Sequence, residues 1–194
     1  YVDANGDGII DDNDRMPLFW SGTPLIHYGF NLEASWKNFD IYALLQGAGM
    51  YTVQFSEVYA EVLWSKGANT PAYFYDRWRK EDPYNPNSKW VAGKWPATRL
   101  IQDTGAMYKE SNIWRRDASY LRLKTLELGY TLPDSILRKS GISNIRFYIN
   151  GYNLLTFCDS FVKAFDPEKV EGSYSAGMNY PLTKSFNIGF TANF

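Results

Sequence analysis

The chain has 194 residues, a formal net charge of −1, 45% hydrophobic and 18% aromatic residues, and a mean hydropathy of −0.39. The near-neutral charge gives no support to nucleic-acid binding, the single cysteine (Cys158) excludes an internal disulfide framework, and the single histidine (His27) excludes a histidine-rich metal site. No stretch approaches the ~18 continuous apolar residues of a membrane-spanning helix, although the alternating strands of a membrane barrel also give low hydropathy.

The sequence has the length of one domain, begins at Tyr1 rather than at a methionine, and shows no signal peptide. We therefore expect it to be a piece of a longer precursor.

A calcium-binding pattern occupies residues 3–14, which begin DANGDG and end at Asp14. Calcium takes about six to eight oxygen ligands, and this spacing supplies them from one short loop. The expected ligands are the side chains of Asp3, Asn5 and Asp7, the backbone carbonyl of Ile9, Asp11 directly or through water, and Asp14, which stands where an EF-hand has Glu. No amphipathic helix flanks the loop, so a stiffening role is favoured over a sensing role.

Two alternating runs, at about 25–36 and 39–50, are separated by Lys37-Asn38. Apolar residues recur at every second position of the first run, and less regularly in the second. This period of two predicts a β-hairpin. Aromatic residues lie near the turn, as in the interface girdle of a membrane barrel.

From 52 to 117 the regular alternation is lost, and a structureless segment of this length usually has a function. Its aromatic residues are candidates for stacking against a sugar or peptide ligand: Tyr73, Tyr75, Trp78, Trp90 and Trp95. The alternative, that these rings pack the loop against itself, remains open.

Three further strands are predicted at 119–131, 145–155 and 185–194, with a second irregular loop at 158–181. The apolar phase shifts near Thr125, which predicts a bulge.

The last strand ends the sequence on an aromatic residue, with no polar tail after Phe194. This is the expected form of the closing strand of an outer-membrane barrel, in which Phe194 would serve as the assembly signal. A C-terminal strand of a soluble sandwich has the same alternation and is the alternative.

Connection lengths favour the barrel. If Phe194 lies on the periplasmic side, the short connections at 37–38 and 132–144 are also periplasmic. The calcium loop and the irregular segments 52–117 and 158–181 then lie outside the cell. Short inner turns and long outer loops are typical of outer-membrane barrels.

The sequence also resembles a known family. The similarity lies in DANGDGIIDDNDR (3–15), WKNFD (36–40), LQGA (45–48), SYLRLK (119–124), LGYTLP (128–133), NLLT (153–156), DPE (166–168) and the terminal Phe194. In this order they resemble the C-terminal part of SusC/RagA-type TonB-dependent outer-membrane transporters. Most of 52–117 has no matching motif.

The resemblance implies that this all-β chain supplies the C-terminal antiparallel strands of a 22-stranded transmembrane β-barrel with long extracellular loops, in the outer membrane of a Gram-negative bacterium. The plug domain is absent from this chain. The implied partners are a SusD-like surface lipoprotein, the TonB complex acting through the missing N-terminal part, the remaining barrel strands, the plug, and membrane lipid. The implied cargo is an oligosaccharide or a peptide.

Two other classes of protein are alternatives for this sequence. One is a calcium-stabilised carbohydrate-binding β-sandwich module of a secreted protein. The other is an enzyme, whose catalytic group would have to include His27, which lies on a predicted strand, or a carboxylate pair such as Glu57 and Glu61. Those two glutamates fit a solvated helix face better, and we expect no enzyme activity.

Overall fold

The computed structural model describes residues 2–17, 19–55, 69–98, 111–138, 141–169 and 180–194. The chain divides into two compact units. The sheet unit comprises 23–51, 117–169 and 180–194, and the loop unit comprises 1–22, 52–116 and 170–179.

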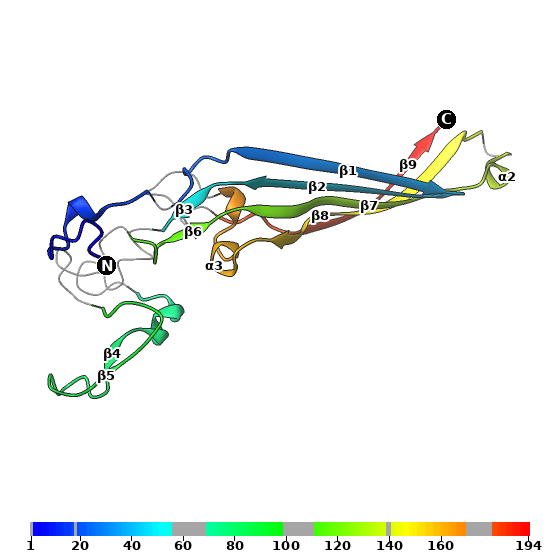
Figure 1. Ribbon diagram of the computed structural model, residues 1–194. Coiled ribbons are helices and arrows are strands. Elements are labelled where there is room, and N and C mark those ends of the chain that lie inside the picture. The colour runs from blue at the N-terminus through cyan, green and yellow to red at the C-terminus, as the bar shows by residue number, and fades with distance from the viewer. Residues whose placement is uncertain (1, 18, 56–68, 99–110, 139–140, 170–179) are drawn as a thin grey trace. The chain divides into compact units, whose positions relative to one another are not determined.

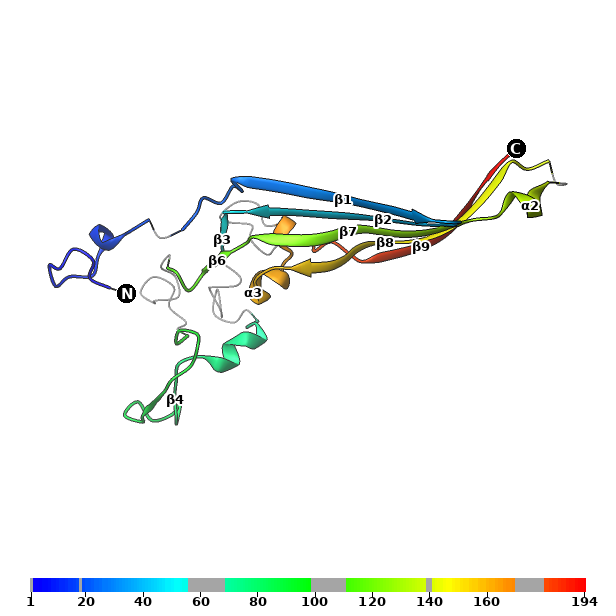
Figure 2. The ribbon, with the colours of Figure 1, turned by 45° about the vertical axis from the view of Figure 1, so that its right-hand side comes forward.

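The sheet unit is a five-stranded antiparallel sheet, in which the long strands lie side by side (Figures 1 and 2). Their spatial order is β1 (Ile26–Trp36), β2 (Phe39–Gly49), β7 (Tyr120–Thr131), β8 (Asn144–Phe157) and β9 (Ser185–Asn193). The expected all-β, antiparallel class is therefore confirmed for this part of the chain. The sheet is open, and its closure into a 22-stranded barrel remains a prediction.

The sheet has two chemically different faces, because the sequence alternates with a period of two and successive side chains of a strand point to opposite sides. Phe39 pairs with Tyr130, and Ile41 pairs with Leu128. The same register continues into the next strand, where Leu128 pairs with Ile149. Apolar side chains therefore align across the strands on one face, which we call the apolar face.

A bulge interrupts this register at the position that the sequence indicates. The pairing of β2 with β7 shifts between Leu44 and Leu45, and the pairing of β7 with β8 shifts between Leu123 and Thr125. An extra residue in one strand restores the apolar alternation after the phase change.

The two ends of the sheet carry different connections. The turn at Lys37 and Asn38, the short helix α2 (Asp134–Leu137) and the C-terminus lie at one end. The helices α3 (Ser160–Lys163) and η5 (Pro167–Lys169) follow β8 at the other end (Figure 2). The side chain of Asp159 caps α3 by accepting the N–H groups of Phe161 and Val162.

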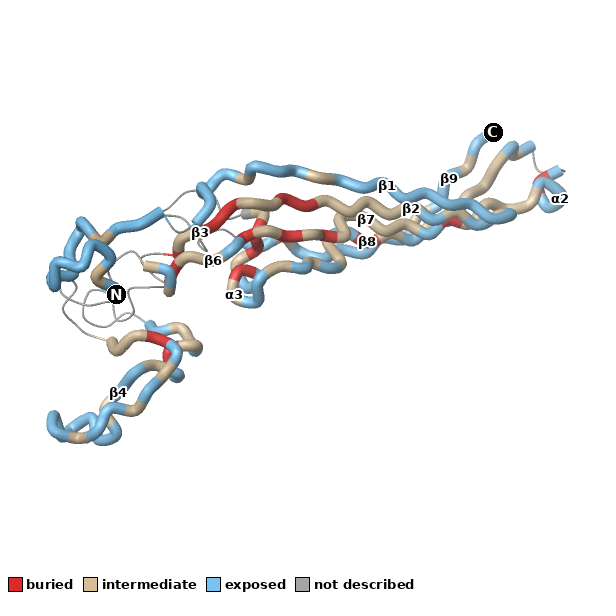
Figure 3. Tube along the Cα trace, in the orientation of Figure 1, coloured by how far each residue is buried: buried red, intermediate tan, exposed pale blue. Residues whose placement is uncertain are grey.

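Burial in the sheet unit concentrates at the α3 end (Figure 3). The buried residues there include Ala48, Tyr51, Tyr120, Arg122, Val162 and Asp166. Among the described residues, no helix is long and apolar enough to cross a membrane.

The loop unit contains short elements: η1 (Asp12–Asp14), β3 (Thr52–Gln54), η3 (Ala72–Asp76), β4 (Arg79–Lys80), β5 (Trp90–Val91) and β6 (Arg115–Asp117), which ends just past its boundary. β3 pairs with β6, and β4 pairs with β5 as an antiparallel hairpin. Its buried core includes Phe55, Phe74, Trp95 and Trp114. The segment expected to be irregular therefore holds local structure. Residues 56–68, with Glu57 and Glu61, lie outside the described residues.

Candidate functional site

The sheet unit exposes its apolar face. Trp36 is 68% exposed and Ile188 is 86% exposed, although both lie within or at the end of long strands. Other large exposed side chains on this face are Phe30, Leu32, Phe39, Ile41, Leu128, Phe147, Ile149, Phe186 and Phe190. Soluble monomers rarely expose an apolar patch of this extent.

The opposite, polar face carries a hydrogen-bonded network across four adjacent strands. The Arg146 guanidinium on β8 pairs with Asp40 on β2 and lies 2.7 Å from the carboxylate of Glu127 on β7. Asn150 donates to the same Glu127 at 3.2 Å, and Asn187 on β9 donates to Asn150 at 2.9 Å. Two carboxylates face one guanidinium, so this network keeps one excess negative charge.

Two glycines make room for this network on the polar face. A Cβ at Gly129 would collide with the guanidinium of Arg146 and the carboxylate of Asp40. A Cβ at Gly189 would collide with the ring of Tyr148. The Arg146 guanidinium also lies 5.4 Å from the centre of the Tyr148 ring. The large polar side chains can therefore lie along the sheet over the glycines.

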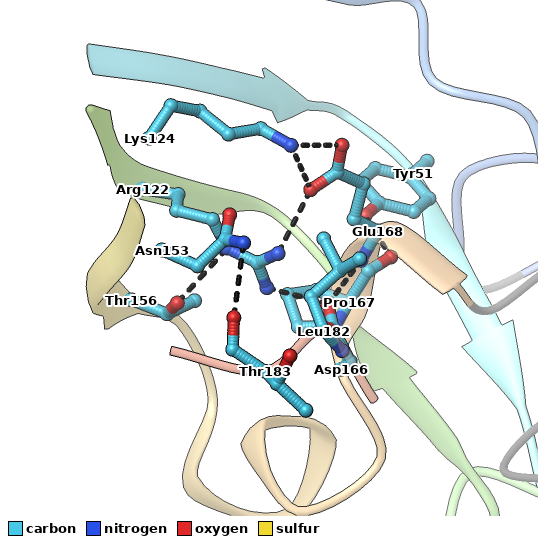
Figure 4. Close-up of polar contacts among 10 residues, drawn as sticks. All are labelled: Tyr51, Arg122, Lys124, Asn153, Thr156, Asp166, Pro167, Glu168, Leu182 and Thr183. Atoms are coloured by element: carbon cyan, nitrogen blue, oxygen red, sulfur yellow. Dashed lines mark hydrogen bonds and ion pairs between the residues drawn. The ribbon is translucent and has the colours of Figure 1, made fainter. Parts of the chain in front are cut away.

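A second polar cluster lies at the α3 end of the sheet (Figure 4). We call it the clasp, and it joins Arg122 and Lys124 of β7 to Asp166 and Glu168. Arg122 donates to Glu168 at 2.8 Å, and Lys124 lies 2.6 Å from the same carboxylate. The side chains of Arg122 and Asp166 are 3% and 4% exposed, so this ion pair is withdrawn from water.

The segment 166–168 also holds neighbouring strands through hydrogen bonds. Asp166 accepts the N–H of Leu182, just before β9, at 2.7 Å. Tyr51, just after β2, donates its hydroxyl to the carbonyl of Pro167 at 2.9 Å, and burial raises the pKa of Tyr51. Arg122 additionally donates to Thr156 on β8 at 3.0 Å.

The clasp thus fixes the connection after β8 onto the sheet. A buried ion pair is costly to desolvate, and its stable form needs every polar atom paired, as found here. Asp166 adopts a positive φ of 68°, which is uncommon for a residue with a side chain. The arrangement favours one defined position of the segment 166–168 over loosely packed alternatives.

The predicted calcium residues lie together in a closed loop. Asp3 accepts the N–H groups of Gly6 and Gly8 at 2.6 and 2.8 Å. Asp14 accepts from Ala4 at 2.8 Å and from Asp11 at 2.8 Å, so the twelfth position folds back against the start of the loop. These backbone hydrogen bonds, led by that from Asp11, lower the pKa of Asp14.

One feature of this loop favours cation binding, and another does not. Gly6 and Gly8 have φ angles of 77° and 82°, which permit the sharp turns of such a loop. The carboxylates accept backbone N–H groups, and within the described part of the chain no three acidic, histidine or cysteine side chains converge as metal ligands. Calcium binding therefore remains a prediction.

The five candidate ligand-binding aromatics separate into two groups. Trp95 is buried, and Tyr73 packs 4.8 Å from its ring centre. Trp95 also stacks on Trp114 at 5.4 Å, as part of the loop-unit core. Because Trp95 lies inside this core, its expected role in ligand stacking is wrong. The other three, Tyr75, Trp78 and Trp90, are exposed.

The clasp was not predicted from the sequence as a site. Its acidic residues lie in DPE (166–168) and its basic residues in SYLRLK (119–124), two of the motifs that carry the family resemblance. The available signal was the two basic residues close together on a predicted strand, because charged side chains that become buried need partners.

No family model matches the chain. Two receptors of Formosa agariphila, "TonB-dependent receptor P3" and "TonB-dependent receptor P26", are 31% and 30% identical to it. The matches cover 100% of this chain and 19% of each receptor, so the chain spans about a fifth of the length of these relatives.

Solved structures of the RagAB peptide transporter are also similar. One matches with a TM-score of 0.68 and 26% identity, over 94% of this chain and 19% of that chain. The importer in its 'closed-closed' state matches with a TM-score of 0.69 and 26% identity, over 98% and 20% of the two chains. These relatives are named as receptors and importers, and none of them is named as an enzyme.

Proposed function

We propose that this chain, which is a SusC/RagA-like section of a TonB-dependent transporter, forms part of the barrel wall of an outer-membrane nutrient importer. One observation carries the proposal: an open sheet exposes a continuous apolar face and bears a charged network on the opposite face. Such a sheet suits lipid on one side and a polar lumen on the other.

The open edges of the sheet support the same proposal. In the described residues, β1 and β9 each have only one strand partner. An unpaired strand edge is costly in a membrane, because its backbone groups find no water there. We infer that the remaining strands of a 22-stranded barrel pair with both edges, and that a plug domain of the same transporter fills the lumen.

The proposed activity is active import of oligosaccharides or peptides. A SusD-like lipoprotein would capture the cargo at the cell surface, and the TonB complex would supply the force through the missing N-terminal part. The named RagAB peptide importer supports a two-component importer. The chain's own proposed contribution is five strands, part of the lumen wall and the outer loops.

The carbohydrate-binding sandwich is less well supported. A sandwich covers the apolar face of one sheet with a second sheet of similar size. Among the described residues, the other sheets have two strands each, and the apolar face of the large sheet remains exposed.

We also propose that residues 3–14 bind a structural calcium ion. The support is the spacing of oxygen-bearing residues, the left-handed Gly6 and Gly8, and the position of Asp14 against the start of the loop. When bound, the ion would supply charge neutralisation and stiffening.

The test uses the native full-length parent, extracted from outer membranes in mild detergent. Mass spectrometry would identify every protein and small molecule that co-purifies. A stoichiometric lipoprotein with bound oligosaccharide or peptide is the expected result. Recovery of the parent as a lone protein in the soluble fraction would overturn the importer and favour the secreted module.

A further inference from the structure

The hairpin of β4 and β5 presents two tryptophans and one lysine on the same face. Lys80 stands directly opposite Trp90 in the antiparallel pairing, so their side chains share a face. Trp78 lies two residues before Lys80, and the alternation of an extended chain places it on that face as well. We call these three residues the tryptophan–lysine face.

Both tryptophans are accessible to a ligand. Trp78 is 45% exposed and Trp90 is 55% exposed. The loop unit already has its own aromatic core, in which Trp95 and Trp114 are almost fully buried. The core of the unit is therefore formed without these two rings, and tryptophan is a residue type enriched at interaction surfaces.

Lys80 adds a positive charge beside the Trp90 ring. Its Nζ lies 4.7 Å from the centre of the Trp90 ring and donates to the carbonyl of Ser88 at 2.7 Å. In the described part of the chain, no carboxylate lies within ion-pair distance of Lys80. Residues 69–98 carry five basic and three acidic side chains, so the charge of this segment also favours an anion.

The hairpin holds these side chains on a hydrogen-bonded frame. Trp78 donates its N–H to the carbonyl of Trp95 at 2.8 Å, and Trp95 donates to Asp76 at 3.0 Å. Glu81 donates to Lys89 at 3.0 Å across the hairpin. Gly93 lies so close to the backbone of Arg77 that an added Cβ would collide with it. A framework of this kind lowers the entropic cost of ordering a binding surface.

We infer that the tryptophan–lysine face binds an anionic oligosaccharide, a chain of pyranose rings that carry carboxylate or sulfate groups. The C–H faces of a sugar ring are apolar and stack against an indole ring, while the anionic group pairs with the Lys80 ammonium. This inference rests on the proposed import function and names the class of its cargo.

A peptide fits this face less well. Extended peptides are commonly recognised by backbone hydrogen bonds along a free strand edge. Here the backbone N–H groups of Trp78 and Glu81, on either side of β4, are already paired within the unit. The exposed rings and the Lys80 ammonium are the groups that this face offers to a ligand, and they match the chemistry of a charged sugar.

The test measures binding to the purified full-length transporter in detergent. Four hexameric probes are compared: a polygalacturonate, a sulfated galactan, a neutral galactan and a hexaglutamate peptide. Binding of at least one anionic sugar is expected, with an affinity that falls as salt is added. The first two probes distinguish carboxylate from sulfate as the anionic group.

Variants then locate the site. Trp78→Ala and Trp90→Ala should each weaken anionic sugar binding about tenfold. Lys80→Met should weaken it about two- to fivefold, as for an exposed ion pair, and should leave neutral sugar binding unchanged. Lys80→Arg keeps the charge and should restore binding. Lys89→Met and Tyr84→Ala, which remove a charge and a ring elsewhere in the hairpin region, are the matched controls and should bind normally.

The inference would be overturned by the absence of binding of both anionic sugars, by equal binding of the neutral sugar, or by tryptophan-dependent binding of the acidic peptide instead. Normal binding by both tryptophan variants would do the same. Energy-dependent uptake by cells is measured in parallel, because it tests the importer separately. If uptake stops when the proton-motive force is dissipated, the importer is supported even if the sugar inference fails. If uptake continues, the importer is contradicted, whichever probes the protein binds.

Discussion

Arg122 and Asp166 form a buried ion pair although they are 44 positions apart in the chain. The pair brings the segment before η5 onto strand β7, and Glu168 extends it to Lys124. The α3 end of the sheet is therefore held by interactions between side chains as well as by the backbone ladder.

Replacing Arg122 by Met should destabilise this end of the sheet, because Asp166 would remain buried without its partner. Breaking one side of a buried pair costs about 3–5 kcal/mol. In the full-length protein in detergent, we expect a lower melting temperature and faster proteolysis within residues 158–169.

Glu168→Gln is the matched control for the clasp. The Glu168 side chain is 24% exposed, so loss of its charge should cost about 1 kcal/mol or less. Equal melting temperatures for Arg122→Met and the unmodified protein would contradict the structural role of the clasp.

Gly189→Val should impair assembly, because the added side chain would collide with the ring of Tyr148. Overpacking of this kind costs about 1–3 kcal/mol. The amount of folded protein in outer membranes, measured by its heat-dependent electrophoretic mobility, should fall.

The double variant Gly189→Val with Tyr148→Ala removes the collision and should recover much of the folded protein. This recovery separates a steric effect from a general intolerance of strand β9 to substitution. A double variant that assembles no better than Gly189→Val would show that the close approach is unimportant.

Replacing Asp3 and Asp7 by Ala should lower the thermal stability of the full-length protein in calcium. An ion present at 100 times its dissociation constant stabilises the folded state by about 2.7 kcal/mol. A chelator should lower the melting temperature of the unmodified protein and have little effect on the variant. Melting that does not respond to chelation would refute the calcium proposal.

Deleting Phe194 should reduce assembly into the outer membrane, if the final aromatic residue is the assembly signal of a closing strand. Phe194→Tyr keeps an aromatic ring at the end of the chain and should assemble normally. Surface labelling of intact cells measures both variants, and normal surface levels of the deletion would remove the support for a closing strand.

Local patterns predicted much of the sheet. The alternation at Phe186, Ile188 and Phe190 places these residues on one face in the structure, opposite Gly151, Ile149 and Phe147. The phase change near Thr125 appears as the bulge. Both are properties of a short segment, because side-chain direction along a strand depends only on position in the alternation.

The aromatic segment was harder to predict from the sequence. Trp90 and Trp95 are the same residue type five positions apart, yet one is exposed and the other buried. Composition cannot distinguish them, because burial depends on neighbours such as Tyr73 and Trp114 that are distant in the sequence. The calcium ligands and the sidedness of the loops remain predictions.

The sequence by itself determined where strands form and which side chains share a face, because the period of two is local. Only the tertiary structure decided which charges meet. Arg122 pairs with Asp166, and Arg146 pairs with Asp40, which is 106 positions away. Strand register and the connection after β8 bring these pairs together. Pairing between distant charges depends on the packing of the whole sheet, and no short stretch of sequence contains that information.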